Sequence, residues 1–190
     1  ENYGSKQQLL NVKLSYVLQC KSDHVVALNG AAQVYPILQK LLAGKKVLIP
    51  DPSFGEYRRI FQHIDTYGDS VGIDLKEVEQ KIATNDVIVL VNPNNPTGTL
   101  IQSEVILKYI DAHTDKFFIV DESFIEFADT PSIMNALELK GRENVLVIRS
   151  MSKSYGLPGV RLGFVYTTNA AFRKEILASV PIWNMNSVAE

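Results

Sequence analysis

The stretch VIVLVNPNNPTG, residues 87–98, joins a continuous apolar run to a turn rich in asparagine and proline. An apolar run made mostly of β-branched residues is typical of a strand buried on both faces, as in parallel sheets that helices cover. The two prolines and the glycine that follow end the strand in a turn. This unit, a buried strand that ends in a polar turn, is the basis of the fold prediction.

Similar runs recur along the chain, separated in most cases by segments with helical periodicity, such as 31–43, 102–113 and 169–178. The last run follows a glycine-rich loop without a full helix, so we expect that strand to be antiparallel. The sequence therefore predicts one α/β domain with an about seven-stranded, mostly parallel sheet. The predicted strands are VVALN (25–29), KVLIP (46–50), HIDTY (63–67), VIVLVN (87–92), FFIVDE (117–122), NVLVIRS (144–150) and RLGFVYT (161–167).

Composition excludes several classes of function. The formal net charge of −2 over 190 residues gives no basic field for nucleic acid or an anionic membrane. The apolar runs are far shorter than the roughly 20 residues that a bilayer requires. The single cysteine, Cys20, cannot form an internal disulfide, which suits a reducing compartment, and we expect the cytoplasm. The three histidines are widely spaced, so we expect no metal site.

Polar or flexible residues follow five of the predicted strands directly. In open α/β sheets, ligands bind outside the carboxyl ends of the strands. We therefore expect five loops to converge on one edge of the sheet. They are Asn29–Gly30, Pro50–Gly55, Asn92–Gly98, Asp121 and Ser150–Lys153.

Two of these loops allow both a structural and a functional interpretation. Asp121 follows four apolar residues, and a buried aspartate is either a helix cap or hydrogen-bonded brace, or a carboxylate that holds a cation or a protonated nitrogen. A plain turn explains the prolines of NPNNPTG, but it needs fewer amides than Asn92, Asn94 and Asn95 supply.

Two further loops have the same ambiguity. The backbone N–H groups of Ala31, Ala32 and Gln33, at the start of a helix, can hold a phosphate, although many strand-to-helix turns contain glycine. Phe54 can stack on a flat ring, although a core aromatic residue is the more common case.

The loop RSMSKSYGLPGVRLG, residues 149–163, gathers cations and hydroxyls. A lone lysine among serines is usually solvated. Here Ser150, Ser152 and Arg161 together make a phosphate site, which leaves Lys153 as a candidate nucleophilic amine. A lysine amine, a phosphate clamp, a carboxylate, an amide and a stacking ring form the set of groups that binds pyridoxal phosphate.

Three motifs together resemble those of the fold-type I, class I/II pyridoxal-phosphate-dependent aminotransferases. They are NPNNPTG (92–98), VDESFIEF (120–127) and SMSKSYGLPGVRLG (150–163). The resemblance extends to NGAAQ (29–33) and PDPSFGEY (50–57), and it is greatest to the branch of histidinol-phosphate aminotransferase and threonine-phosphate decarboxylase. It implies the three-layer α/β/α large domain of that fold.

The resemblance also implies a role for each site residue. Lys153 would form the Schiff base and move protons, and Asp121 would pair with the pyridine nitrogen of pyridoxal 5′-phosphate. Asn95 would hydrogen-bond the ring 3-oxygen, and Phe54 would stack on the ring. The phosphate would be bound by Ser150, Ser152, Arg161 and the backbone amides of Ala31, Ala32 and Gln33.

The chain departs from the family pattern at two places. Phe124 stands where many members have a tyrosine that bonds the 3-oxygen, so we expect the Schiff base to keep its proton to higher pH. Ala32 and Gln33 replace acidic or threonine residues of the phosphate turn, and backbone binding should survive this change.

The resemblance covers only part of such an enzyme. We expect residues 1–190 to be the cofactor-binding large domain, with the N-terminal segment and the C-terminal small domain, which carries the arginine for the substrate carboxylate, outside this sequence. The isolated chain should then have little turnover and weak cofactor affinity. The resemblance implies a homodimer for the full-length protein.

Four functions remain open from the sequence. The first is transamination of an amino acid or amino-phosphate substrate, and the second is decarboxylation of a phosphorylated amino acid. The third is a serine hydrolase, because Ser150–Lys153 matches S-x-x-K, although KTG and SDN motifs are absent from the sequence. The fourth is a non-catalytic domain that binds partners.

Overall fold

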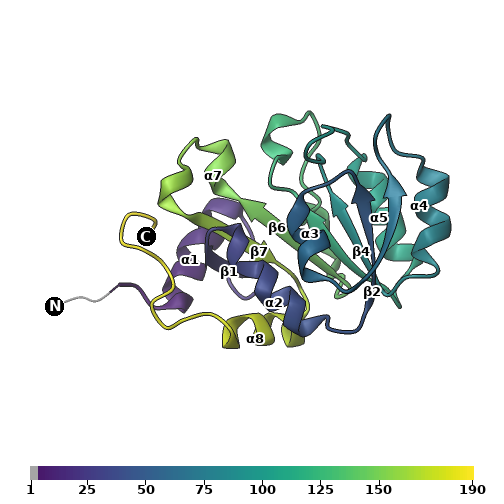
Figure 1. The fold of residues 1–190 in the computed structure, drawn as a ribbon. Helices are drawn as coiled ribbons and strands as arrows, with labels where there is room; N and C mark the ends of the chain where they lie inside the picture. Colours follow the sequence, from purple (N-terminus) through teal and green to yellow (C-terminus); the bar gives the residue numbers. More distant parts are fainter. Residues whose placement is uncertain (1–3) are drawn as a thin grey trace.

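A seven-stranded sheet runs through the molecule in the order β1-β7-β6-β5-β4-β2-β3 (Figure 1). The computed structural model describes residues 4–190. The strands are β1 (Val25–Asn29), β2 (Lys46–Asp51), β3 (His63–Gly68), β4 (Val87–Val91), β5 (Phe117–Asp121), β6 (Val145–Ser150) and β7 (Leu162–Tyr166). All seven predicted strands are present, with ends that differ from the prediction by one residue at most.

Strand β7 is antiparallel to both of its neighbours, β1 and β6, and every other pairing is parallel. The prediction of a mostly parallel sheet with one antiparallel strand is confirmed. Because β7 runs the other way, its amino end lies at the edge where the parallel strands have their carboxyl ends. Arg161, which directly precedes β7, is thereby brought to that edge.

Helices cover both faces of the sheet, as a sheet buried on both faces requires (Figure 1). The α-helices are α1 (Gln7–Leu18), α2 (Val34–Leu41), α3 (Gly55–Ile60), α4 (Leu75–Ile82), α5 (Ser103–Ala112), α6 (Met134–Lys140), α7 (Met151–Ser154) and α8 (Ala170–Ala178). Short 3₁₀ turns are η1 (Ala31–Gln33), η2 (Ile125–Phe127) and η3 (Pro158–Val160).

Two hydrophobic cores result, one on each face of the sheet. Strand β4 shows the division, because Val87, Val89 and Val91 pack with α2, α3 and α8, whereas Ile88 and Leu90 pack with α4, α5 and α6. This alternation follows from the two-residue period of a strand. The predicted three-layer α/β/α arrangement is confirmed. Within residues 4–190, no helix is both long and apolar enough for a bilayer crossing.

Candidate active site

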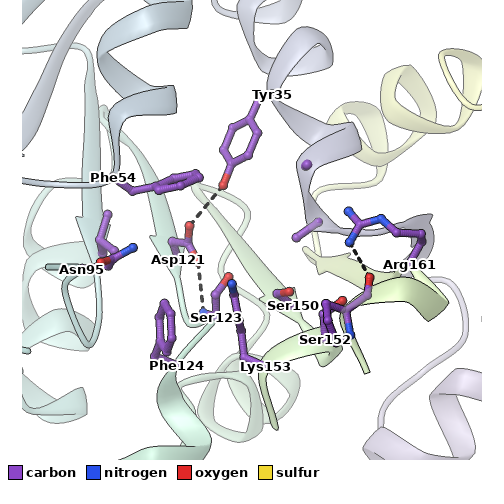
Figure 2. Close-up of a pocket in the computed structure, with 14 residues that line it drawn as sticks. Tyr35, Phe54, Asn95, Asp121, Ser123, Phe124, Ser150, Ser152, Lys153 and Arg161 are labelled. Carbon is purple, nitrogen blue, oxygen red and sulfur yellow. Dashed lines mark hydrogen bonds between the residues drawn. The ribbon is translucent and has the colours of Figure 1, made fainter. Parts of the chain in front are cut away.

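A cavity of about 170 Å³ opens at the carboxyl edge of the sheet (Figure 2). Its lining comes from the loops after β1, β2, β4, β5 and β6 and from the segment before β7, so the predicted convergence of loops occurs. Nine of the ten predicted site residues line it: Ala31, Ala32, Phe54, Asn95, Asp121, Ser150, Ser152, Lys153 and Arg161.

Gln33 is the predicted residue that does not line the cavity. Its backbone N–H donates to the Gly30 carbonyl at 3.2 Å. Its side chain accepts from the Asn29 N–H at 2.9 Å and donates to Asn184 Oδ1 at 2.7 Å. The geometry therefore assigns Gln33 to bracing of the turn, and Ala31 and Ala32 are the turn residues that line the cavity.

Asp121 ends β5 and is only 3% exposed. Its Oδ2 accepts from the Tyr57 hydroxyl at 2.7 Å and lies 3.5 Å from the Tyr35 hydroxyl, and its Oδ1 accepts from the Ser123 N–H at 3.0 Å. The carboxylate is therefore held by structural hydrogen bonds and also lines the cavity, where its role as the partner of a cation or protonated nitrogen stays a prediction.

The two tyrosines beside Asp121 remain hydrogen-bond donors at physiological pH. Burial raises the pKa of Tyr57 well above its ordinary value, and the negative charge of Asp121 raises it further. The same two causes raise the pKa of Tyr35. A phenol that stays protonated keeps donating to the carboxylate. Tyr57 does so from outside the cavity lining, whereas Tyr35 is itself one of the lining residues.

The asparagines of the NPNNPTG turn divide between structure and site. Asn92 exchanges two hydrogen bonds with Ile101, at 2.9 and 2.7 Å. Asn94 donates to the Pro52 carbonyl at 2.9 Å and accepts from Ser53 Oγ at 2.9 Å. These two brace the loop, and Asn95 is the one that lines the cavity. Two of the three asparagine side chains in this turn are therefore explained by a structural role.

One end of the cavity suits an anion. Ser152 Oγ is buried and has no hydrogen-bond partner among the described residues, although buried hydroxyls are normally paired. Ser150 and Arg161 line the same end, and Arg161 donates from Nη1 to the Pro158 carbonyl at 2.9 Å (Figure 2). An orphaned hydroxyl beside a guanidinium is the arrangement expected for a phosphate.

Two glycines allow this end to close tightly. A Cβ on Gly30 would lie 2.3 Å from Arg161 Nη2, so only glycine lets the guanidinium pack over the turn after β1. A Cβ on Gly163 would lie 2.3 Å from the Ala31 nitrogen, so only glycine lets β7 pass directly behind that turn. Arg161 itself has a left-handed backbone, with φ of 58°.

Lys153 lies on α7, a single helical turn that begins right after β6. Its Nζ is 5.6 Å from the centre of the Phe124 ring, which also lines the cavity. Figure 2 shows Phe54 and Lys153 on opposite sides of Asp121. Phe54 is 38% exposed and packs at 5.9 Å against Tyr35, so its ring can cover a ligand.

Sequence reasoning missed three residues that hold Asp121: Tyr35, Tyr57 and the backbone of Ser123. A signal for Tyr57 exists, since it ends PDPSFGEY (50–57), a stretch to which the family resemblance extends. Tyr35 carries no comparable signal, because its helix reads as an ordinary amphipathic segment.

Comparison with known proteins agrees with this geometry. A family model described as "Aminotransferase class I and II" matches residues 6–188. Histidinol-phosphate aminotransferase of Ruminiclostridium cellulolyticum is 31% identical, over 88% of this chain and 49% of its own length. The crystal structure of L-threonine-O-3-phosphate decarboxylase from Porphyromonas gingivalis superposes with a TM-score of 0.86 at 30% identity, over 99% of this chain and 60% of that one.

A second solved structure, histidinol-phosphate aminotransferase from Clostridium acetobutylicum, also has a TM-score of 0.86, at 29% identity over 99% of this chain and 58% of that one. The chain thus spans about half the length of the relatives it matches. Enzymes of the matched family use pyridoxal phosphate. Since the family model covers nearly all of the sequence, the chain belongs to the class I and II aminotransferase family.

Proposed function

We propose that this chain is the cofactor-binding large domain of a pyridoxal-phosphate-dependent aminotransferase that acts on an amino acid or amino-phosphate. One observation carries the proposal above all: a buried carboxylate, Asp121, and a primary amine, Lys153, line one cavity together with the Arg161 guanidinium and the unpaired Ser152 hydroxyl. When bound, pyridoxal phosphate supplies an electron sink for bonds at the substrate α-carbon.

The lining residues fit this cofactor. Asp121 would hold the protonated ring nitrogen, because hydrogen bonds from Tyr57 and the Ser123 N–H favour the charged form of its carboxylate. Asn95 would donate to the ring 3-oxygen. The phosphate would be held by Ser150, Ser152, Arg161 and the turn at Ala31 and Ala32.

The remaining roles concern the reacting face. Lys153 supplies the primary amine of the site and moves a proton at Nζ, as a general acid and base must. Phe54 covers the flat face of the cofactor and limits the access of water. Both side chains are more exposed than Asp121, so the reactive face is the open one.

The whole enzyme extends this proposal. The substrate carboxylate would be bound by parts that lie outside residues 1–190, and the isolated chain would have little turnover. We expect the complete protein to be a homodimer, as family membership favours. We also expect it to act on small-molecule substrates in the cytoplasm.

A spectral experiment tests the proposal. The complete gene product with pyridoxal phosphate should develop a visible absorbance band. Lys153→Ala should lose this band, whereas Lys108→Ala, an exposed lysine on α5, should retain it. A Lys153→Ala protein with the wild-type band would refute the role of Lys153.

Decarboxylation of a phosphorylated amino acid is the second candidate. The similarity to the Porphyromonas gingivalis decarboxylase supports it, because that structure and the Clostridium acetobutylicum aminotransferase match equally well in TM-score. Phe124 is a further point in its favour, although a slight one. Assays of the complete gene product for CO₂ release and for 2-oxo-acid-dependent amino transfer separate the two.

Two weaker candidates have little support. A serine hydrolase of the S-x-x-K type would leave Asp121 and Asn95 in the cavity without a role, and the family match is to aminotransferases. A non-catalytic domain would not need an unpaired buried hydroxyl at Ser152. Covalent labelling of Ser150 by a β-lactam probe would support the serine-hydrolase candidate.

A further inference from the structure

The Tyr57 hydroxyl makes the shortest hydrogen bond to Asp121. The O–O distance of 2.7 Å is typical of a hydroxyl that donates to an ionised carboxylate, whereas the Tyr35 hydroxyl, at 3.5 Å, is at the limit of a hydrogen bond. Tyr57 is fully buried and does not line the cavity. It therefore acts on Asp121 from behind, without touching what the cavity binds.

This bond also joins α3, which carries Tyr57, to the end of β5. Phe54 is the N-cap residue of α3 and Tyr57 lies in its first turn, where the Tyr57 N–H donates to the Phe54 carbonyl at 3.4 Å. Tyr35 packs against both rings, at 5.4 Å from Tyr57 and 5.9 Å from Phe54. The residue whose hydroxyl holds the carboxylate thus lies in the same helical turn as Phe54 and shares a ring contact with it through Tyr35.

The lone pairs of Asp121 limit what this arrangement can do. A carboxylate has about four acceptor sites, and among residues 4–190 the Ser123 N–H is the one donor to Oδ1. With Oδ2 anchored by Tyr57, the carboxylate cannot rotate freely, and a lone pair of Oδ1 remains available to a further donor. A fixed acceptor binds a ring N–H better than a rotating one, because less orientation is lost on binding.

We propose that Tyr57 is a positioning residue, which fixes the Asp121 carboxylate and the Phe54 ring in register and so determines how firmly the ring nitrogen of the cofactor is held. This inference rests on the proposed function. It assigns a specific role to a residue that neither contacts the cavity nor belongs to the three sequence motifs.

Tyr57→Phe in the complete gene product tests the role, because it keeps the ring and removes only the hydroxyl. The dissociation constant for pyridoxal phosphate should rise about tenfold, which corresponds to about 1.4 kcal/mol. The kcat should fall about tenfold, with KM for the amino donor changed by less than about twofold. Tyr35→Phe should have smaller effects, because its hydroxyl is farther from Asp121.

A spectroscopic readout separates positioning from simple destabilisation. A ring nitrogen that Asp121 holds less firmly carries less positive charge. The titrating group is the Schiff base of Lys153, which then keeps its proton to higher pH. The pH midpoint of the visible band should therefore rise in Tyr57→Phe. In an Asp121→Asn background the same substitution should change cofactor affinity little, since the two residues would act as one unit.

Tyr166→Phe is the matched control. Tyr166 is also fully buried and donates to a carboxylate, Glu138 Oε2, at 2.7 Å, but it pairs with Val25 at the opposite edge of the sheet. It should lose a similar free energy of unfolding and keep wild-type affinity, kcat and pH midpoint. If Tyr57→Phe behaves like Tyr166→Phe in all three, Tyr57 is only structural. If the wild type shows no Lys153-dependent band, the proposed function fails first.

Discussion

Two acidic neighbours, Asp121 and Glu122, leave the end of β5 in different directions. Asp121 accepts from Tyr57, whereas Glu122 accepts from the Ile133 N–H at 2.9 Å at the start of α6. Burial raises the pKa of Glu122, and the hydrogen bonds from Ser132 and Ile133 oppose this effect. At the residue scale, adjacent carboxylates thus serve a cavity and a helix terminus, because successive side chains of an extended chain face opposite sides.

Phe124 offers a prediction at the same scale. Phe124→Tyr would add a hydroxyl at a ring that already lines the cavity, and this hydroxyl would be a second donor, beside Asn95, to the 3-oxygen of the proposed cofactor. A further donor to that oxygen favours its negative form. The stabilised oxygen then attracts the proton of the Schiff base less strongly, so this proton is lost at lower pH. The pH midpoint of the visible band, which reports the pKa of the Schiff base, should therefore fall by about one unit.

The measurement is a pH titration of that absorbance in wild type and variant. Phe127→Tyr is a suitable control, because Phe127 is 68% exposed and does not line the cofactor cavity. An unchanged midpoint in Phe124→Tyr would show that the Phe124 position does not influence the cofactor.

At the scale of elements, the loop after β4 depends on a carboxylate from another strand. Asp69, which follows β3 and is fully buried, accepts at Oδ2 from Asn94 Nδ2 at 2.5 Å, Thr97 Oγ1 at 3.1 Å and Thr99 Oγ1 at 2.5 Å. Three donors on one oxygen hold the NPNNPTG turn closed. Asn95, between them in sequence, receives its position from this brace.

Asp69→Ala should therefore damage both stability and the site. It leaves the buried Asn94 amide without one of its two acceptors, whereas Thr97 and Thr99 are partly exposed and can hydrogen-bond each other. A buried unpaired donor costs about 1–3 kcal/mol, so we expect a loss of about that size in the free energy of unfolding. Cofactor affinity should fall with it. Urea denaturation and a cofactor titration measure the two effects.

Asp115→Ala is the control for this brace, since the Asp115 side chain is 73% exposed and pairs only with Lys116. Exposed ion pairs contribute about 0–1 kcal/mol. Equal losses of unfolding free energy in the two variants would contradict a role for Asp69 in holding the turn.

Helix α7 shows why one element could not be predicted. It has four residues, which is too short for a hydrophobic period to appear, and its sequence MSKS reads as a polar loop. The longer helices at 31–43, 102–113 and 169–178 were predictable from their apolar spacing, although the first divides into η1 and α2. The short turn is formed by the chain leaving β6, and it is this turn that carries Lys153.

At the scale of the whole molecule, buried tyrosines link stability to alkaline pH. Burial raises the pKa of five of them above the ordinary value of 10.0: Tyr35, Tyr57, Tyr67, Tyr109 and Tyr166. A raised pKa in the folded state means that the unfolded chain loses these protons first as pH rises through 10. The stabilising contribution is complete below pH 10 and is lost above it.

The free energy of unfolding should therefore fall above pH 10, by about 1.4 kcal/mol per pH unit for each such tyrosine. Tyr57→Phe and Tyr166→Phe should each flatten this slope by about that amount. Urea denaturation between about pH 9 and pH 11 measures it. The exposed Tyr16, at 81%, provides a control in Tyr16→Phe, whose slope should match wild type. If Tyr57→Phe leaves the pH dependence of the unfolding free energy unchanged, the raised pKa of Tyr57 is contradicted.

The sequence by itself determined the seven strands, the longer amphipathic helices, the mostly parallel sheet with its antiparallel strand, and most of the residues that line the candidate cavity. Local patterns carry this information, because strand and helix periods and turn residues act over a few positions. Only the tertiary structure decided the strand order, the separation of Asn95 from the bracing Asn92 and Asn94, and the hold of Tyr57 on Asp121. Those contacts join residues distant along the chain, and they depend on how whole layers pack, which no local pattern specifies.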